Sequence, residues 1–308
     1  MCGFVALIRP RSRSHEETSA LVTATRLVRH RGPDDEGYLL WDPLAGTGVF
    51  AGDETTCASR EEHRLADVPG ASEWQIAFGH RRLSILDLTP AGHQPMLHRA
   101  SGLAVIYNGE IYNFVELRGE LEQLGHAFDG HSDTEVLLAA WAEWGPECVA
   151  RFNGMFAFVL FDPRSRQIHA VRDRFGIKPL YWARVSDRVV FASEIKQIRS
   201  LPQFAPRLDL AAAYDYLSMG RHDHSARTFD EGVFQLRGGE RAIVAVDDPS
   251  LTINVERWYE APDIEWSGND GDAVDEFLAL LTDSVRISLR SDVALGSCLS
   301  GGLDSSSI

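Results

Sequence analysis

The apolar positions of the chain form short runs and helical stripes that follow one another in a definite order. Residues 2–8 are an almost continuous apolar run, which predicts a buried strand. Apolar runs at 75–79 and 103–107 predict further strands, and turn segments separate four more runs between residues 155 and 193. Predicted strands therefore dominate the first 200 residues.

Three stretches with apolar residues at helical spacing accompany these strands. Residues 16–29 place five apolar side chains on one helical face. A second helix is predicted to start at Asn113, with Glu116 completing a capping box, and a third to run from Ser132 to Trp144. Because the helices come in blocks and do not follow every strand, the pattern predicts a layered α+β domain.

Segments rich in polar residues or proline predict how the chain divides into domains. Residues 42–74 are rich in small and polar side chains and are interpreted as a long loop, an insertion with some local structure. The segment LPQFAPRLD, residues 201–209, carries two prolines and is interpreted as a linker. The linker separates a first domain, residues 1–200, from a second, residues 210–308.

The second predicted domain has fewer elements. A helix is predicted at 210–219, and strands or a hairpin at 233–246 and 251–258. Residues 272–290 have an apolar helical face. The near-continuous apolar run at 293–299 is typical of a fully buried parallel strand.

Composition and charge narrow the class of protein. The 308 residues are 44% hydrophobic and 24% charged, as in ordinary globular chains, and no apolar stretch is long enough for a membrane-spanning helix. A net charge of −15 disfavours binding to nucleic acid or to an anionic membrane. The apolar run at residues 2–8 precedes the basic residues, unlike a secretory signal, so a cytoplasmic protein is expected.

The cysteines and histidines give no metal-binding pattern, and no metal site is expected. No two of the four cysteines form a CxxC pair. Cys148 and Cys298 are interpreted as packing residues, whereas Cys57 lies in a polar loop. His222 and His224 lie two residues apart in a polar segment, where solvent exposure is a simpler interpretation than metal binding.

Cys2 is the first candidate for chemistry. Removal of Met1, which a small second residue permits, would place the Cys2 thiol beside a free α-amino group. That amine, with an ordinary pKa of about 7.7–8.0, can accept the proton of the adjacent nucleophile. Gly3 would allow a substrate to approach closely. Taken alone, Met-Cys-Gly is more simply explained as an incidental cysteine.

The segment SGGLDSSS, residues 300–307, is the second candidate. It follows the predicted strand at 293–299, and its hydroxyls and backbone N–H groups suit a phosphate. It lacks the Gly-Lys-Ser/Thr of a Walker A loop. The alternative is a Gly/Ser-rich helix cap.

Seven motifs occur in a fixed order along the chain. They are RHRGPD, HRRLSILDL, NGEIYN, SDTE, GMFAFVLFD, RDRFGIKPLYW and FASEIK. The set resembles the class II glutamine amidotransferases, and most closely the glutamine-hydrolysing asparagine synthetase family; residues 42–74 are the main departure. The resemblance implies an N-terminal-nucleophile αββα sandwich, followed by the incomplete start of an α/β ATP-pyrophosphatase domain.

The same resemblance implies a role for each residue of a glutamine pocket. Cys2 would attack the glutamine side-chain amide and form a γ-glutamyl thioester, releasing ammonia. Asn108 and Gly109 would form the oxyanion hole, and a guanidinium would bind the substrate α-carboxylate. That guanidinium would be Arg82. Glu110 and Asp133 would lie near the substrate α-ammonium, and Leu83 and Ile85 would contact glutamine through their backbone.

Taken one at a time, these residues have simpler explanations. Asn108-Gly109 is the commonest signal for a tight hairpin turn. Asp133 lies where an acidic residue suits the first turn of a helix, and Arg82 would by default be a surface side chain. Only their joint occurrence with Cys2 favours the glutamine pocket.

For the second candidate, the resemblance implies an adenylation site that uses ATP and Mg²⁺. Aspartate would be the usual carboxylate acceptor for the ammonia, and glutamine the nitrogen donor. Cys298 stands where an aliphatic residue is common in the family. The implied ATP-binding positions are Leu299, Ser300, Gly301, Gly302, Asp304 and Ser305.

A single parallel strand at 293–299 would leave backbone groups unpaired on both sides. Residues 210–308 are therefore expected to pack poorly alone, as in a truncated, split or fragmentary enzyme. A homodimer or a complementing C-terminal chain is a possible partner. A non-catalytic remnant, and an amidotransferase for a sugar or natural-product carboxylate, stay open as alternatives.

Overall fold

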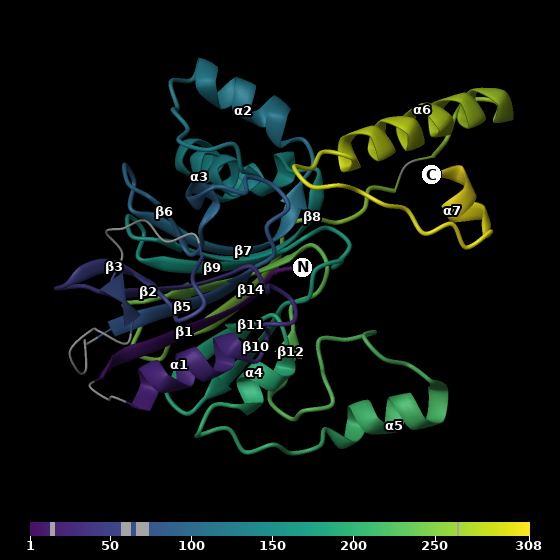
Figure 1. Ribbon diagram of the computed structural model, residues 1–308. Helices are drawn as coiled ribbons and strands as arrows, with labels where there is room; N and C mark the ends of the chain where they lie inside the picture. Colours follow the sequence, from purple (N-terminus) through teal and green to yellow (C-terminus); the bar gives the residue numbers. More distant parts are fainter. Residues whose placement is uncertain (13–15, 57–62, 66–73, 264) are drawn as a thin grey trace.

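Two β-sheets packed face to face form the centre of the molecule, and helices cover both outer faces (Figure 1). The computed structural model describes residues 1–12, 16–56, 63–65, 74–263 and 265–308. The layered αββα sandwich that the sequence implied is confirmed.

The first sheet has eight strands within the described residues. They are β1 (Gly3–Ser12), β2 (Asp35–Asp42), β3 (Gly46–Ala51), β4 (His63–Arg64), β5 (Trp74–Arg82), β10 (Tyr181–Val185), β11 (Arg188–Ala192) and β12 (Val233–Gln235). Their spatial order is β12-β10-β11-β1-β5-β2-β3-β4. Neighbours are antiparallel except β3 and β4, which are parallel.

The second sheet has six strands within the same ranges, all antiparallel to their neighbours. They are β6 (Met96–His98), β7 (Leu103–Ile111), β8 (Gly154–Asp162), β9 (Gln167–Arg172), β13 (Glu240–Ala245) and β14 (Ile253–Arg257). Their spatial order is β14-β13-β9-β8-β7-β6. Strands β1, β5 and β7 lead to the site described below.

The helices divide into those that cover a sheet and those that project. Helices α1 (Glu16–Arg26) and α4 (Ile195–Arg199) pack on the first sheet, and α2 (Phe114–Gln123) and α3 (Asp133–Trp144) on the second. The projecting helices are α5 (Leu210–Met219), α6 (Asp270–Ser288) and α7 (Leu303–Ser307) (Figure 1). No described helix is long and apolar enough to cross a membrane.

Strand β1 is buried on both faces, which explains why its sequence does not alternate. Phe4 and Ile8 face the core between the two sheets, whereas Val5 and Leu7 pack against the helices on the outer face. Burial of each such side chain contributes about 1.5–3 kcal/mol. The strand predicted from the apolar run is therefore confirmed, and it continues to Ser12.

The start of α2 differs from the prediction. The side chain of Asn113 makes no cap hydrogen bond; its Oδ1 accepts from the Asn153 N–H (2.8 Å) and its Nδ2 donates to the Arg151 carbonyl (3.0 Å). Glu116 pairs with Arg290. The predicted capping box is therefore wrong, because both side chains are engaged by other segments.

Part of the segment interpreted as a loop is sheet. Strand β2 precedes it, and β3 pairs with β2 through a turn in which Asp42 Oδ1 accepts from the N–H groups of Leu44 and Ala45. The loop interpretation is wrong for β3, whose glycine-rich sequence is only partly buried and so lacks a strong apolar pattern. Cys57 lies outside the described residues.

Strands β12, β13 and β14 confirm the strands predicted between 233 and 258, and they join the two sheets of the sandwich. Strand β12 pairs with β10, and β13 pairs with β9. Leu236 and Val244 belong to the core between the sheets. The expectation that this part of the chain packs poorly is therefore wrong for these strands.

Residues 293–299 form no strand. Leu295 and Leu299 are 52% and 75% exposed, and Cys298 is also exposed. The predicted buried parallel strand is wrong, because no described segment lies beside it to accept and donate backbone hydrogen bonds. Cys298 is thus not a packing residue, whereas Cys148 is buried as predicted.

Candidate active site

The predicted glutamine-pocket residues, which come from distant parts of the sequence, line one cavity. Its volume is about 170 Å³. The residues that line it include Cys2, Arg82, Leu83, Ile85, Asn108, Gly109, Glu110 and Asp133. The fold therefore brings together every residue that the sequence assigned to the glutamine pocket.

Cys2 reaches the cavity because β1 pairs with β5 in a register that places Gly3 opposite Arg81. The Leu83 N–H donates to the Cys2 sulfur, with the nitrogen 3.3 Å from Sγ. Arg31 Nε donates to the Cys2 carbonyl at 2.9 Å. Cys2 is therefore held at the wall of the cavity through both its sulfur and its backbone carbonyl.

The glycine that follows Cys2 meets a packing requirement. A Cβ atom on Gly3 would lie 2.8 Å from Cγ2 of Val28. Gly3 therefore lets the start of β1 approach Val28, and close approach of a substrate at this position stays a prediction.

Burial raises the pKa of the Cys2 thiol, and the Leu83 N–H, the terminal ammonium and Arg82 oppose that rise. Burial also lowers the pKa of the Met1 α-amino group. Both shifts favour the neutral forms of a thiol and an amine, which is the state from which a proton can pass between them.

Asn108 and Gly109 lie inside β7 and not in a turn. They pair with Ala157 and Phe156 of β8, so the hairpin-turn alternative is wrong. A Cβ atom on Gly109 would lie 2.4 Å from the Met155 carbonyl oxygen. The glycine is required because the two strands approach closely at this point.

The side chain of Asn108 is 1% exposed, and neither its Oδ1 nor its Nδ2 has a hydrogen-bond partner among the described residues. A buried amide without partners costs about 1–3 kcal/mol. Because this amide lines the cavity, a bound ligand can supply the missing hydrogen bonds.

Arg82 is also buried, at 4% exposure, so the surface alternative is wrong. Its Nη2 donates to the carbonyls of Leu86 (3.0 Å) and Asp87. Its Nη1 is buried and has no partner within the described part of the chain. The guanidinium is therefore fixed in the wall with one donor free for an anion.

Two carboxylates face the cavity. Asp133, in the first turn of α3, accepts from the Tyr107 hydroxyl (2.7 Å) and the Ile111 N–H (3.0 Å). Burial raises the pKa of Asp133, and the Tyr107 hydroxyl opposes that rise. Burial and the Asp133 charge raise the pKa of Glu110. A cationic ligand would stabilise the ionised form of both.

Sequence reasoning missed several residues of the cavity wall. Gln94 Oε1 accepts from the Tyr107 N–H (2.8 Å), and Gln94 Nε2 lies 3.4 Å from the Thr134 hydroxyl. Lys178 is buried in the wall and lies in the motif RDRFGIKPLYW. The motif itself was the signal for Lys178, but nothing in the residue pattern indicated that its side chain points inward.

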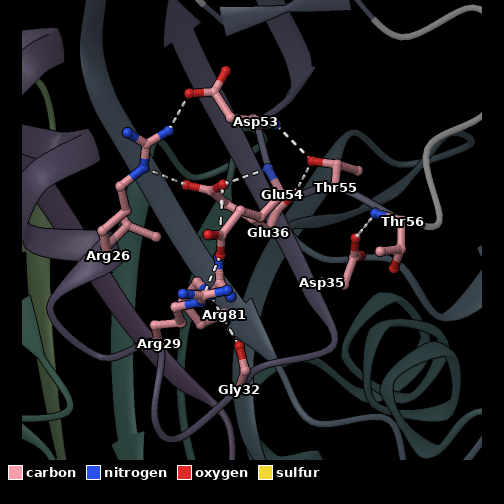
Figure 2. A network of polar contacts seen from close by, with 12 residues as sticks. Arg26, Arg29, Gly32, Asp35, Glu36, Asp53, Glu54, Thr55, Thr56 and Arg81 are labelled. Atoms are coloured by element: carbon pink, nitrogen blue, oxygen red, sulfur yellow. Dashed lines mark hydrogen bonds and ion pairs between the residues drawn. The ribbon is translucent and has the colours of Figure 1, made fainter.

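A buried ion-pair network lies behind Arg82, on the opposite face of β5 (Figure 2). Arg81 and Glu36 stand directly opposite each other in the pairing of β5 with β2, and neither side chain is exposed. Arg81 Nη1 lies 3.6 Å from Glu36 Oε2 and 2.8 Å from Glu54 Oε2. Its Nε donates to the Gly32 carbonyl at 2.9 Å.

This network supports the backbone that holds the thiol. The Asp34 N–H donates to the Arg82 carbonyl (3.0 Å), and Asp34 Oδ2 accepts from the Ser84 N–H (2.8 Å). A Cβ atom on Gly32 would lie 2.3 Å from the Arg81 carbonyl carbon. The turn at residues 31–34 therefore packs directly against the segment that carries the Leu83 N–H.

We expect Glu36→Gln to lower the free energy of unfolding by about 3 kcal/mol, because it leaves Arg81 in a buried position with less charge to oppose it. Asp53→Asn is the matched control. Asp53 pairs with Arg26 in the same network but is 57% exposed, so its loss should cost less than about 1 kcal/mol. Urea denaturation of both variants measures the difference, and equal losses would contradict the prediction.

The second candidate segment forms a different arrangement. The Ser300 hydroxyl hydrogen-bonds to the Ser305 hydroxyl (2.9 Å), and the Gly302 N–H lies 3.4 Å from Ser300 Oγ. Gly302 caps α7, as in the helix-cap alternative, and Asp304 lies in its first turn. These groups bond to one another at the surface, and the ATP-binding role of the segment stays a prediction.

The histidine pair lies at the surface near α5. His224 Nε2 is 3.1 Å from Asp215 Oδ2, and the ring of His222 lies 6.4 Å from that of Tyr216. Within the described ranges, no three His, Cys, Asp or Glu side chains gather in a group that could hold a metal ion.

Two family models match the chain. The first, described as a glutamine amidotransferase domain, matches residues 52–259, and the second, described as asparagine synthase, matches residues 276–308. The first therefore covers more than half of the chain.

Curated relatives match along the whole chain. Asparagine synthetase [glutamine-hydrolyzing] 1 of Bacillus subtilis (strain 168) is 33% identical over an alignment of 310 residues that covers 100% of this chain and 43% of the relative. A putative asparagine synthetase [glutamine-hydrolyzing] of Mycobacterium bovis is 34% identical over an alignment of 324 residues that covers 100% of this chain and 45% of the relative. The chain spans less than half the length of these two relatives.

A solved structure shares the fold. Glutamine phosphoribosylpyrophosphate amidotransferase from B. subtilis, complexed with ADP and GMP, aligns with a TM-score of 0.59 and 20% sequence identity, over 84% of this chain and 50% of that one. Similarity at this level of identity concerns the fold alone. Fold, family match and relatives agree, and the chain belongs to the family of glutamine amidotransferase domains, with glutamine-hydrolysing asparagine synthetases among its relatives.

Proposed function

We propose that the chain hydrolyses L-glutamine to glutamate and ammonia at the cavity that contains Cys2. The observation that carries the proposal is a set of buried polar groups around the thiol that have no hydrogen-bond partner among the described residues. The Asn108 amide and Arg82 Nη1 are buried, line the same cavity as Cys2 and have no partner among the described residues. Family membership supports glutamine as the substrate.

The proposed reaction begins once Met1 has been removed. The free amine of Cys2 accepts the thiol proton as Sγ forms a bond to the amide carbon of glutamine. The negative charge that develops on the amide oxygen is stabilised by the Asn108 side chain and the Gly109 N–H. The resulting ammonium returns a proton to the leaving nitrogen, and ammonia departs. Water then hydrolyses the thioester and the thiol is restored.

The proposed orientation of glutamine follows from charge. The free donor of Arg82 binds the substrate α-carboxylate, since a guanidinium suits a carboxylate. Glu110 and Asp133 bind the α-ammonium, and the ligand charge lowers their raised pKa values towards the ordinary range. Leu83 and Ile85 contact the substrate through the backbone. This arrangement directs the side-chain amide towards Cys2.

We further propose that the ammonia serves an ATP-dependent amidation of a carboxylate, aspartate by default. The names of the relatives and the asparagine synthase match at residues 276–308 support this class of reaction. ATP, Mg²⁺ and the acceptor would need residues beyond those of the segment 299–305, whose groups bond to one another here. For the domains, we propose that the amidotransferase unit extends to about residue 259, because β12 to β14 belong to its sheets.

The glutaminase proposal is tested with the purified 308-residue chain, after mass spectrometry has confirmed removal of Met1. Release of glutamate from L-glutamine is the expected result. A matched preparation with a non-cleavable residue before Cys2 should release none, because its amine is no longer beside the thiol. Absence of glutamate release by the processed chain would overturn the proposal.

A further inference from the structure

Lys178 is a buried cation without a partner. It is 4% exposed and lines the same cavity as Cys2. Its ammonium makes no hydrogen bond or ion pair with any described residue. A charged side chain that is largely buried, lines a cavity and has no protein partner is a candidate for a functional role. The position of this lysine therefore needs an explanation beyond packing.

The backbone around Lys178 is fixed, so its side chain has little freedom to turn away. Asp173 is fully buried, and its carboxylate accepts from the N–H groups of Phe175, Ile177 and Lys178, each at 3.0 Å. Arg172 Nε donates to the Lys178 carbonyl at 2.7 Å. Both polar groups of the Lys178 peptide unit are thus held while its ammonium is left unpaired.

The groups that face Lys178 come from several elements. The pKa of Lys178 is lowered by burial; nearby negative groups oppose that effect, and Arg31 adds to it. The pKa of the Met1 α-amino group, which occupies this end of the chain in the structure, is lowered by burial, and the charges of Lys178 and Arg31 lower it further. The ionisable groups around the lysine and the thiol include the Met1 amine and Cys2 just before β1, Arg31 after α1, Arg82 on β5, Glu110 on β7, Asp133 on α3 and Asp173 after β9.

We propose that the unpaired ammonium of Lys178 keeps the terminal amine of a chain that begins at Cys2 in its neutral form and favours the thiolate of Cys2. The inference rests on the proposed glutaminase function, in which that amine is the base. A protonated amine cannot accept the thiol proton, so a neighbouring fixed cation widens the pH range in which the base is available. Lys178 thus acts on the nucleophile and its base through its charge.

The sign of the effect can be followed through one substitution. Lys178→Met removes the charge and keeps the apolar stem. Without repulsion from the lysine, the terminal amine holds its proton to higher pH, and the thiol loses a group that favours its ionised form. In a plot of kcat/KM against pH, the acid limb should therefore shift to higher pH by about half to one unit. Lys178→Arg keeps the charge and should leave the limb where it is.

The chain offers a matched control, because its two lysines are Lys178 and Lys196. Lys196 is 44% exposed and pairs with Glu194 (2.9 Å). Lys196→Met should leave the pH profile unchanged. Lys178→Gln serves as the uncharged variant if the methionine lowers the melting temperature. A variant that is only less stable would have lower activity, but the acid limb of its pH profile would stay at the same pH.

A second readout does not depend on glutamine turnover. Cys2 alkylation by iodoacetamide is followed from pH 5 to 9 by peptide mass spectrometry. The expected result is a rate about three- to tenfold lower near pH 7 in Lys178→Met, and close to wild type in Lys178→Arg. Alkylation profiles that coincide in the wild type and Lys178→Met would overturn the inference. An equal fall of the alkylation rate in Lys178→Met and Lys178→Arg would also overturn it. Failure of glutamate release with shifted alkylation would overturn only the glutaminase proposal.

Discussion

Replacing Cys2 with alanine is expected to lower the kcat of glutamine hydrolysis by about four orders of magnitude or more. The variant keeps the oxyanion donors but has no atom that can form the thioester. Among the described residues, the Cys2 thiol hydrogen-bonds with the backbone of one residue, Leu83, whose N–H donates to the sulfur and whose carbonyl accepts from it, so the fold should tolerate the change. Glutamate release under saturating glutamine, and the melting temperature, are the two measurements.

Cys298→Ala is the control for this substitution. Cys298 is an exposed free thiol, and its loss should leave glutamate release unchanged. Residual turnover in Cys2→Ala above about one hundredth of the wild-type kcat would contradict the assignment of the nucleophile. A trapped γ-glutamyl thioester on Cys2 in the wild-type chain, detected by mass spectrometry after acid quench, would support it.

Asn108→Ala is expected to lower kcat by about 10²- to 10³-fold, with a much smaller change in KM. The reason is that the Asn108 amide is proposed to interact with charge that develops in the transition state and not with the bound substrate. Steady-state kinetics of glutamate release measures both constants.

The same substitution makes an unusual prediction for stability. Because the Asn108 side chain has no hydrogen-bond partner among the described residues, its removal takes away an unmet buried amide. The free energy of unfolding should stay the same or rise. A loss of kcat together with a loss of stability would point to a structural role, and an unchanged kcat would exclude Asn108 from the oxyanion hole.

Much of the core of the fold was predictable because most of its strands carry long apolar runs, although the buried strand β2 was not predicted. Residues 4–8 and 156–161 are buried on both faces in the centre of the sheets, and burial of that kind leaves a clear pattern. Strand β3 was missed since it lies near the sheet edge with a glycine-rich, half-exposed sequence. The run at 293–299 has the pattern of a buried strand but no described neighbour, and a pattern cannot reveal whether a neighbour exists.

The candidate site was predictable in its residues but not in its geometry. Ordered motifs pointed to Cys2, Arg82 and Asn108, and the cavity contains all three. The motifs could not show that the Asn108 amide is buried without partners, because that depends on the spacing of two strands. Lys178 was missed for a similar reason: a lysine in a turn is ordinarily exposed, and hydrogen bonds between its backbone and the side chains of Asp173 and Arg172 hold it in the cavity wall.

The return of the chain to both sheets at β12 and β13 limits how this protein can be shortened. A chain cut after residue 200 would lose one of the two neighbours of β10 in the first sheet and one of the two neighbours of β9 in the second. Each sheet would then present a bare row of N–H and C=O groups, which is a template for self-association. A chain cut after residue 259 would keep both rows covered by its own strands, and so would be the shorter form suited to work on the amidotransferase unit alone.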